Sequence, residues 1–171
     1  MTSTLDLDRL IHLFKLEPLP GEGGLFRQTW MSPYQASLPG EDAVRPQGTA
    51  IFYLLTDQPD SFSAMHRLPV DEVWHFYLGD PLEMTLLYPD GHSTQVLLGQ
   101  DVFAGQQPQW IVPAGVWQGT RLAAGGRFAL AGTTMAPGFI PSDLELGTPD
   151  ALLEQYPQAR RQILALTRPV K

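Results

Sequence analysis

Short apolar segments alternate with turn signals through the middle of this 171-residue chain, and this alternation limits the folds open to it. The segments are bounded by clusters of glycine, proline and aspartate, which is typical of β-strands joined by tight turns. Nine strands are predicted, at residues 25–31, 49–56, 64–68, 72–78, 83–88, 94–98, 109–112, 117–122 and 127–135. Strands at this spacing favour an all-β sandwich or barrel.

Two connections between these strands carry more specific predictions. Pro89, Asp90 and Gly91 lie between two predicted strands. Because glycine supplies the positive φ of a tight turn, they predict a hairpin. Residues 32–46 hold three prolines and no periodic pattern, so we predict a surface loop that could lie over the mouth of a barrel.

Helices are predicted at both ends of the chain. Residues 6–16 have apolar side chains at helical spacing and stop at residues 17–24, which contain two prolines and three glycines. Near the carboxyl end, Thr148 and Pro149 mark a helix start, and Pro157 divides the segment into two short helices. These two helices are expected to pack outside the barrel or at a subunit contact.

Composition excludes several classes of protein and of site. The chain has no cysteine, which removes disulfides, thiolate metal ligands and a cysteine nucleophile. Eleven basic residues against eighteen acidic ones give a net charge of −7, so no nucleic acid partner is expected. No long apolar run or secretory signal is evident, which predicts a cytoplasmic protein without a membrane partner. The length suits one domain, over residues 1–171.

Strand alternation groups the residues that can carry chemistry. Glu72, Trp74 and Phe76 share one face of their predicted strand, and His75 lies on the other face. If Glu72 points inward, the interior receives a carboxylate, two aromatic rings and the imidazole of His66 from the preceding strand. Gln118 follows a proline-glycine turn that can bring its amide to the same place.

Two stretches of the chain resemble the sequence motifs of the cupin superfamily. The first cupin motif reads HxHxxxE and, after six further residues, glycine. His66 takes the first histidine place, Leu68 the second and Glu72 the glutamate place, and Gly79 closes the motif. The second motif centres on PxGxxH, and residues 113–118 match it with Gln118 in place of the histidine. The resemblance implies a double-stranded β-helix, the RmlC-like jelly-roll barrel, here with short terminal helices.

The same resemblance bears on a metal cofactor. Ordinary cupins hold a divalent metal with three histidines and one glutamate, and such ligands suit Fe, Mn, Ni or Zn. Here the metal-ligand candidates are His66, Glu72 and Gln118, and Leu68 removes one ligand. Two alternatives stay open: a weakened metal site helped by His75 or water, or a pocket without metal. A bulge would have to break strand alternation for His75 to join the site.

A narrower resemblance extends over most of the chain. Residues 23–30, 66–68, 71–75, 79–82 and 136–139 resemble, in this order, the small single-domain cupins catalogued as a domain of unknown function. This resemblance implies a homodimer with an enclosed small-molecule pocket and no settled activity.

Further candidates for binding a small molecule come from the same stretches: Arg27, Trp74, Phe76, Trp117 and Thr133. Arg27 can clamp a carboxylate or phosphate, and the aromatic rings can stack on a sugar or another ring. Structural alternatives stand beside these roles. Arg27 can form a salt bridge, the aromatic side chains can fill the barrel, and His66 and Glu72 can be a mutually satisfied buried pair.

The residues support two functions of different class. The first is an enzyme of isomerase, epimerase or metal-dependent type, acting on a small polar or sugar-like substrate with His66 and Glu72 as catalytic groups. The alternative is a non-catalytic cupin that binds or senses a metabolite in the same pocket. A structural or storage role ranks third, because storage cupins usually have two barrels.

Overall fold

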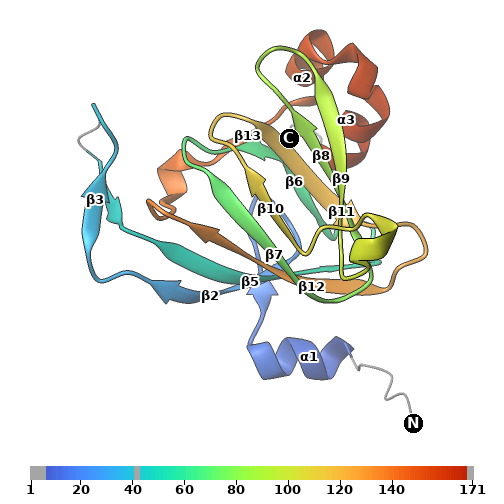
Figure 1. Ribbon diagram of the computed structural model, residues 1–171, viewed down its shortest axis with the longest axis horizontal. Coiled ribbons are helices and arrows are strands. Elements are labelled where there is room, and N and C mark those ends of the chain that lie inside the picture. The colour runs from blue at the N-terminus through green and yellow to red at the C-terminus, as the bar shows by residue number, and fades with distance from the viewer. Residues whose placement is uncertain (1–6, 41–42, 169–171) are drawn as a thin grey trace.

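Two antiparallel β-sheets form the body of the protein, whose computed structural model describes residues 7–40 and 43–168 (Figure 1). The first sheet has the order β1-β2-β5-β12-β7-β10 and the second the order β13-β6-β11-β8-β9. The first sheet consists of β1 Glu17–Pro18, β2 Leu25–Met31, β5 Thr49–Thr56, β12 Phe128–Met135, β7 Glu72–Gly79 and β10 Gln109–Val112. The second consists of β13 Glu145–Leu146, β6 Phe62–Arg67, β11 Trp117–Leu122, β8 Leu82–Leu87 and β9 Ser93–Leu98. The prediction of an all-β fold is confirmed.

The main apolar core lies between the two sheets. Trp74 and Phe76 of the first sheet and Met84 and Leu86 of the second are buried together in one cluster. Along β7, the residues at every second position from Glu72 to Phe76 are buried, while the residues between them are partly exposed. This is the period of two that a strand imposes on its side chains. Glu72 is therefore turned toward the interior of the protein.

The two sheets face each other without closing into one continuous barrel. In residues 7–40 and 43–168, a single bridge between Leu98 and Gln107 joins the edge of β9 to the segment before β10. The loop between these strands contains the 3₁₀ helix η1, Val102–Ala104. Within the described residues, ladder hydrogen bonds therefore do not run around the whole structure. The predicted jelly-roll fold is thus present as two facing sheets that do not close into one barrel.

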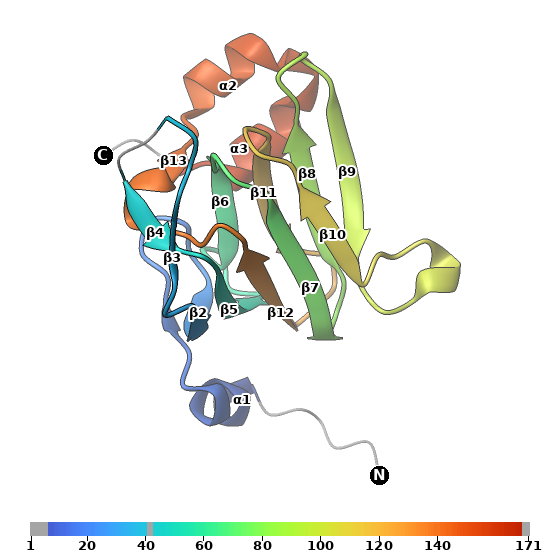
Figure 2. The same cartoon turned by 60° about the vertical axis from the view of Figure 1, so that its left-hand side comes forward.

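The prediction for residues 32–46 was wrong in part, because this segment contains two strands. β3, Gln35–Ser37, pairs with β4, Val44–Pro46, in a separate small sheet. Figure 1 and Figure 2 show this sheet at the margin of the molecule. The buried Arg45 of β4 forms an ion pair with Asp143 in the 3₁₀ helix η2, Pro141–Asp143. This contact attaches the small sheet to the main body.

The predicted hairpin between β8 and β9 is confirmed. Leu87 of β8 pairs with Ser93 of β9 across the turn. Gly91 has a φ of 91°, and its N–H donates to the carbonyl of Tyr88 at 2.9 Å. Glycine is suited to this place because other residues rarely adopt a positive φ.

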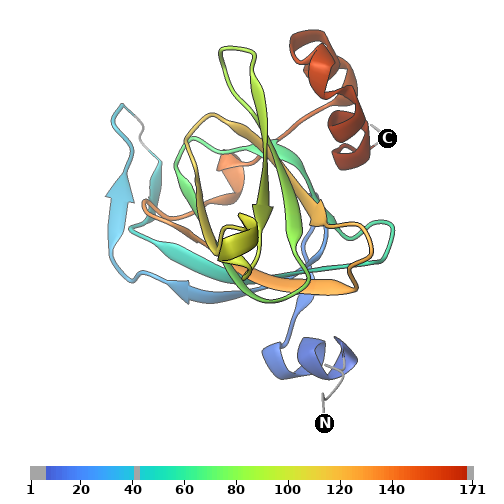
Figure 3. The ribbon, with the colours of Figure 1, turned by 45° about the vertical axis from the view of Figure 1, so that its right-hand side comes forward.

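Helices cover the outer faces of the two sheets on opposite sides of the molecule (Figure 3). α1, Leu7–Phe14, packs against the first sheet through a cluster that contains Leu10 and Leu54, and its predicted start at residue 6 lies outside the described residues. The carboxyl-terminal helical segments are α2 Pro149–Gln155, η3 Pro157–Ala159 and α3 Arg160–Leu166. They pack against Met65 on the second sheet, and the predicted break at Pro157 is confirmed. None of the helices in the described ranges is both long and apolar enough to cross a membrane.

Candidate functional site

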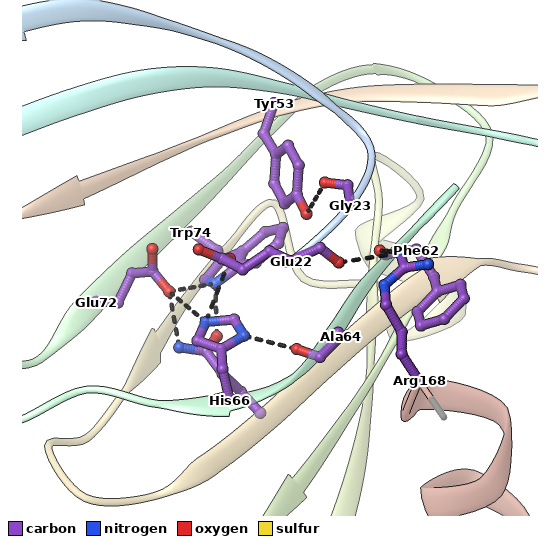
Figure 4. A network of polar contacts seen from close by, with 10 residues as sticks. Glu22, Gly23, Tyr53, Phe62, Ala64, His66, Glu72, Trp74 and Arg168 are labelled. Carbon is purple, nitrogen blue, oxygen red and sulfur yellow. Dashed lines mark hydrogen bonds and ion pairs between the residues drawn. The ribbon is translucent and has the colours of Figure 1, made fainter. Parts of the chain in front are cut away.

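A polar cluster lies between the sheets and consists of the buried residues His66, Glu72, Trp74 and Gln118 and the partly buried Glu22 (Figure 4). β7 supplies Glu72 and Trp74 from the first sheet, and β6 and β11 supply His66 and Gln118 from the second. His66 and Gln118 stand directly opposite each other in the pairing of their strands. The structure therefore brings together the three residues that the cupin-like motifs single out.

Hydrogen bonds hold the Glu72 carboxylate in one orientation. Its Oε2 atom accepts from Nε2 of Gln118 at 2.7 Å and from the indole N–H of Trp74 at 3.2 Å. The same indole N–H also donates to Oε1 of Gln118 at 2.9 Å. Trp74 and Gln118 therefore fix this oxygen as a hydrogen-bond acceptor in the interior.

The imidazole of His66 is oriented by a backbone group. Its Nδ1 lies 2.7 Å from the carbonyl oxygen of Ala64. A carbonyl only accepts, so Nδ1 carries the hydrogen and Nε2 of the neutral ring has a free lone pair. Nε2 lies 3.6 Å from Oε2 of Glu22 and 4.0 Å from Oε2 of Glu72. The unprotonated nitrogen of His66 thus lies near two carboxyl groups.

Glu22 is the cluster residue that sequence reasoning missed. It lies in the turn between β1 and β2, where Gly21, Gly23 and Gly24 all have positive φ. A Cβ on Gly23 would lie 2.5 Å from the carbonyl oxygen of Phe62, so glycine allows the turn to approach the start of β6. From the sequence, residues 17–24 are predicted only to end the preceding helix. A glutamate flanked by glycines was the available signal.

Burial changes the acidity of Glu22. Loss of contact with water raises the pKa of this carboxyl above its ordinary value of 4.5, the nearby His66 opposes the rise, and Glu72 adds to it. Desolvation disfavours the charged carboxylate, and a second carboxylate acts in the same direction. Glu22 therefore exchanges its proton closer to neutral pH than an exposed glutamate does.

A cavity of about 390 Å³ adjoins the cluster at Glu22. Its polar lining residues are Glu17, Glu22, Gln28, Thr49 and Thr133, and apolar side chains such as Leu68 and Met135 supply much of the remaining wall. In the described part of the chain, Glu22 is the one cluster residue that also lines this cavity. Its volume is within the range of small-molecule sites.

Three of the predicted pocket residues lie on the inner side of the sheets. Thr133 of β12 stands opposite Trp74 of β7 and lines the cavity. Trp74 belongs to the polar cluster through its indole N–H. Phe76 is buried in the apolar core between the sheets. Leu68, at the place of the second cupin histidine, also lines the cavity.

The structure does not bring Arg27 and Trp117 to this cavity. Phe26 and Gln28 of β2 line the cavity, and Arg27 between them points to the other face of the strand. There its guanidinium lies 5.5 Å from the centre of the Phe52 ring. Trp117 packs outside the second sheet, in the cluster that contains the carboxyl-terminal helices. Both side chains therefore lie on the outer face of their sheet, away from the cavity.

His75 also lies on the outer face, as strand alternation requires. Its Nε2 is 3.1 Å from Oγ1 of Thr134, and its ring is stacked on Tyr77. Partial burial lowers the pKa of His75 below its ordinary value of 6.5. The alternative in which a bulge turns His75 toward His66 and Glu72 is therefore wrong, because His75 lies on the opposite face of β7.

The donor set of the cluster does not fit a divalent metal ion. No group of three or more histidine, aspartate or glutamate side chains in residues 7–40 and 43–168 is arranged to hold a metal. Oε2 of Glu72 already accepts two hydrogen bonds, and Oε1 of Gln118 is engaged by Trp74. Leu68 offers no ligand where a cupin histidine would stand. The chemistry of the cluster is therefore derived from its own side chains.

Comparisons with known proteins give a consistent result. The chain matches the family model described as "Cupin superfamily (DUF985)" over residues 8–147. An uncharacterised protein of Saccharomyces cerevisiae is 32% identical over 130 residues. That match includes 69% of this chain and 64% of the yeast protein, so the chain covers less than two thirds of the length of this relative.

Solved structures extend the comparison to the fold. A hypothetical protein from Leishmania major is 30% identical with a TM-score of 0.87, covering 95% of this chain and 99% of that one. A protein from Shewanella oneidensis is 35% identical with a TM-score of 0.84, covering 96% and 99%. A dTDP sugar isomerase from Desulfovibrio desulfuricans is 20% identical with a TM-score of 0.51, covering 80% and 82%. This last likeness concerns the fold alone and confirms the jelly-roll architecture.

Proposed function

The chain belongs to the DUF985 family of the cupin superfamily, and we propose that it is an acid–base enzyme of isomerase or epimerase type acting on a small, uncharged, sugar-like molecule. One observation carries the proposal: Glu22 lines the cavity and has Nε2 of His66 behind it at 3.6 Å. A proton-transfer group is thus in contact with the ligand space and has a second such group within reach.

The proposed chemistry is proton transfer at a carbon next to a carbonyl. Glu22 removes the proton from this carbon, and the electron pair moves to the carbonyl oxygen to give an enolate. Returning the proton to the opposite face of the same carbon yields an epimer. Returning it to the former carbonyl carbon, while the hydroxyl proton of the deprotonated carbon moves to the former carbonyl oxygen, yields an isomer. A raised pKa suits the Glu22 carboxyl to this step, because a base works best when its pKa is near the working pH.

His66 and Glu72 support this step from behind Glu22. The lone pair on Nε2 of His66 can take the proton that Glu22 has removed, because Nδ1 is already bonded to Ala64. The imidazolium then lies near two carboxylates, of which Glu72 is held by Trp74 and Gln118. Charge in the interior is stabilised only when such partners are present.

The charge of the cavity lining supports an uncharged substrate. Its ionisable residues, within the part of the chain that is described, are the carboxylates Glu17 and Glu22. A phosphate or carboxylate on the ligand would be repelled by these groups and would lack the arginine that usually binds it.

The proposal is tested by solvent exchange. Pairs of aldoses and ketoses, each with and without a phosphate group, are incubated with the protein in D₂O and followed by proton NMR. We expect loss of the signal of a hydrogen next to the carbonyl in at least one uncharged sugar. The exchange should be about tenfold or more faster than in its phosphorylated partner, as expected for an unfavourable interaction of about 1.4 kcal/mol.

Faster exchange in the phosphorylated sugars would contradict the proposed substrate class. Tight binding of an uncharged sugar with no exchange and no product would favour the alternative function, a cupin that binds or senses a metabolite. The homodimer implied by the family resemblance stays a prediction.

A further inference from the structure

Ala64 of β6 fixes the position of both proton-transfer groups through its backbone. Its N–H donates to the carbonyl oxygen of Glu22 at 2.8 Å, and its own carbonyl oxygen accepts from Nδ1 of His66 at 2.7 Å. The backbone of Ala64 therefore holds both the turn that carries Glu22 and the imidazole of His66. A shift of the turn along β6 would change the distance between Oε2 of Glu22 and Nε2 of His66.

Arg168 holds the same turn from the carboxyl-terminal side (Figure 4). Its Nη2 atom lies 3.2 Å from the carbonyl oxygen of Glu22, 3.0 Å from that of Asp60 and 3.4 Å from that of Phe62. The guanidinium also lies 4.3 Å from the centre of the Phe62 ring. One charged group therefore links the Glu22 turn to the first residues of the strand that bears His66.

The turn is shaped to receive this guanidinium. A Cβ on Gly23 would lie 2.1 Å from Nη2 of Arg168, so a larger residue there would displace the guanidinium. The opposite side of the turn is held by Tyr53, whose hydroxyl donates to the carbonyl oxygen of Gly23 at 2.8 Å. Arg168 follows α3, which is anchored on the second sheet by the buried Ile163 and Leu166. The packing of α3 therefore fixes the position of the backbone that precedes Arg168.

We propose that Arg168 is a positioning residue that keeps the Glu22 carboxyl against His66 and at the cavity wall. This inference rests on the proposed acid–base function of Glu22. Arg168 acts on the backbone of the turn and is not placed in contact with substrate. Its removal frees the turn on one side while Tyr53 and Ala64 still hold the other contacts.

The test compares three variants. R168M keeps an apolar stem without donors, R168K restores three donors on one nitrogen, and R160M removes an exposed arginine from α3, the helix that precedes Arg168. Carbon-13 NMR follows the titration of the Glu22 carboxyl, whose titratable neighbours are His66, Glu72 and Tyr53, while Arg168 contacts the backbone carbonyl of Glu22. In R168M we expect this pKa to fall toward its ordinary value, because the carboxyl leaves its buried position. R168K should restore most of the shift, and R160M should leave it unchanged.

The turnover number gives a second measurement, made with a sugar whose hydrogen exchange the protein catalyses. Misplacement of a reacting group should lower kcat of R168M by about 10- to 100-fold with little change in KM. An unchanged Glu22 titration in R168M, even with lower stability toward urea, would overturn the positioning role. That outcome would leave the acid–base role of Glu22 intact, because the E22Q variant tests that role separately. If E22Q kept full turnover while R168M shifted the Glu22 titration, the acid–base function of Glu22 would be overturned. The positioning role of Arg168 would stand.

Discussion

Replacing Glu22 by glutamine should lower kcat for an uncharged substrate by about 10²- to 10⁴-fold, the usual contribution of a general acid or base. Glutamine keeps the size of the side chain and removes the proton that is transferred. Glu22 lines the cavity and lies 3.6 Å from His66, so the loss concerns chemistry more than binding. The measurement is the rate of hydrogen exchange or of product formation at saturating substrate.

The same variant has a second expected property, which separates lost chemistry from lost folding. The folded state raises the pKa of Glu22 above the ordinary 4.5 of an unfolded chain. Its contribution to the free energy of unfolding is therefore complete below pH 4.5 and is lost as pH rises through the folded pKa. E22Q does not ionise, so its stability relative to wild type should increase over that pH range. Urea denaturation at several pH values measures this.

Two further variants complete the comparison with E22Q. E154Q removes an exposed carboxylate on α2 and should keep full activity. The double variant E22Q/H66Q should be about as active as the less active of the two single variants. The effects of substituting two residues that act as one unit do not add. Additive losses would mean that Glu22 and His66 act independently.

Trp74→Ala should lower the free energy of unfolding by about 3–5 kcal/mol, the range for truncating a large buried aromatic side chain. Trp74 is 1% exposed and lies in the core between the sheets. Trp74→Phe keeps an aromatic ring, removes the indole N–H and leaves a smaller side chain. Glu72 then keeps its hydrogen bond from Gln118, while Oε1 of Gln118 loses its donor. We expect a loss of about 1–3 kcal/mol, the cost of one unsatisfied buried polar atom.

Trp30→Phe is the matched control for this pair. Trp30 lies in β2 and is 50% exposed, so the same substitution there should change stability by no more than about 0.5 kcal/mol. Urea denaturation of the three variants gives the comparison. Equal effects at Trp30 and Trp74 would contradict the role of the indole N–H in the cluster.

Much of the fold could be predicted because strand and turn signals are local. β2, β5, β10 and β11 have the predicted limits, and the hairpin at Gly91 follows from the φ of one residue. The small sheet of β3 and β4 could not be found in the same way. Its strands have three residues each, which is too short for a periodic pattern.

The candidate site was only partly predictable, for a similar reason. His66, Glu72 and Gln118 lie in recognisable motifs, but Glu22 reaches them through contacts that no local pattern encodes. Its turn is held by Arg168, 146 residues away in the sequence. Alternation also leaves open which face of a strand is buried when both faces carry apolar groups. Arg27 and Trp117 were therefore placed in the pocket although their side chains point outward.

The most direct test of the coupled cluster is the titration of the Glu22 carboxyl by carbon-13 NMR in wild type, E72Q and H66Q. The expected result is a pKa above 4.5 in wild type. It should fall in E72Q, because Glu72 opposes ionisation of Glu22, and rise in H66Q, because His66 favours that ionisation. An ordinary glutamate pKa that is the same in all three proteins would contradict a buried, coupled Glu22–His66–Glu72 site.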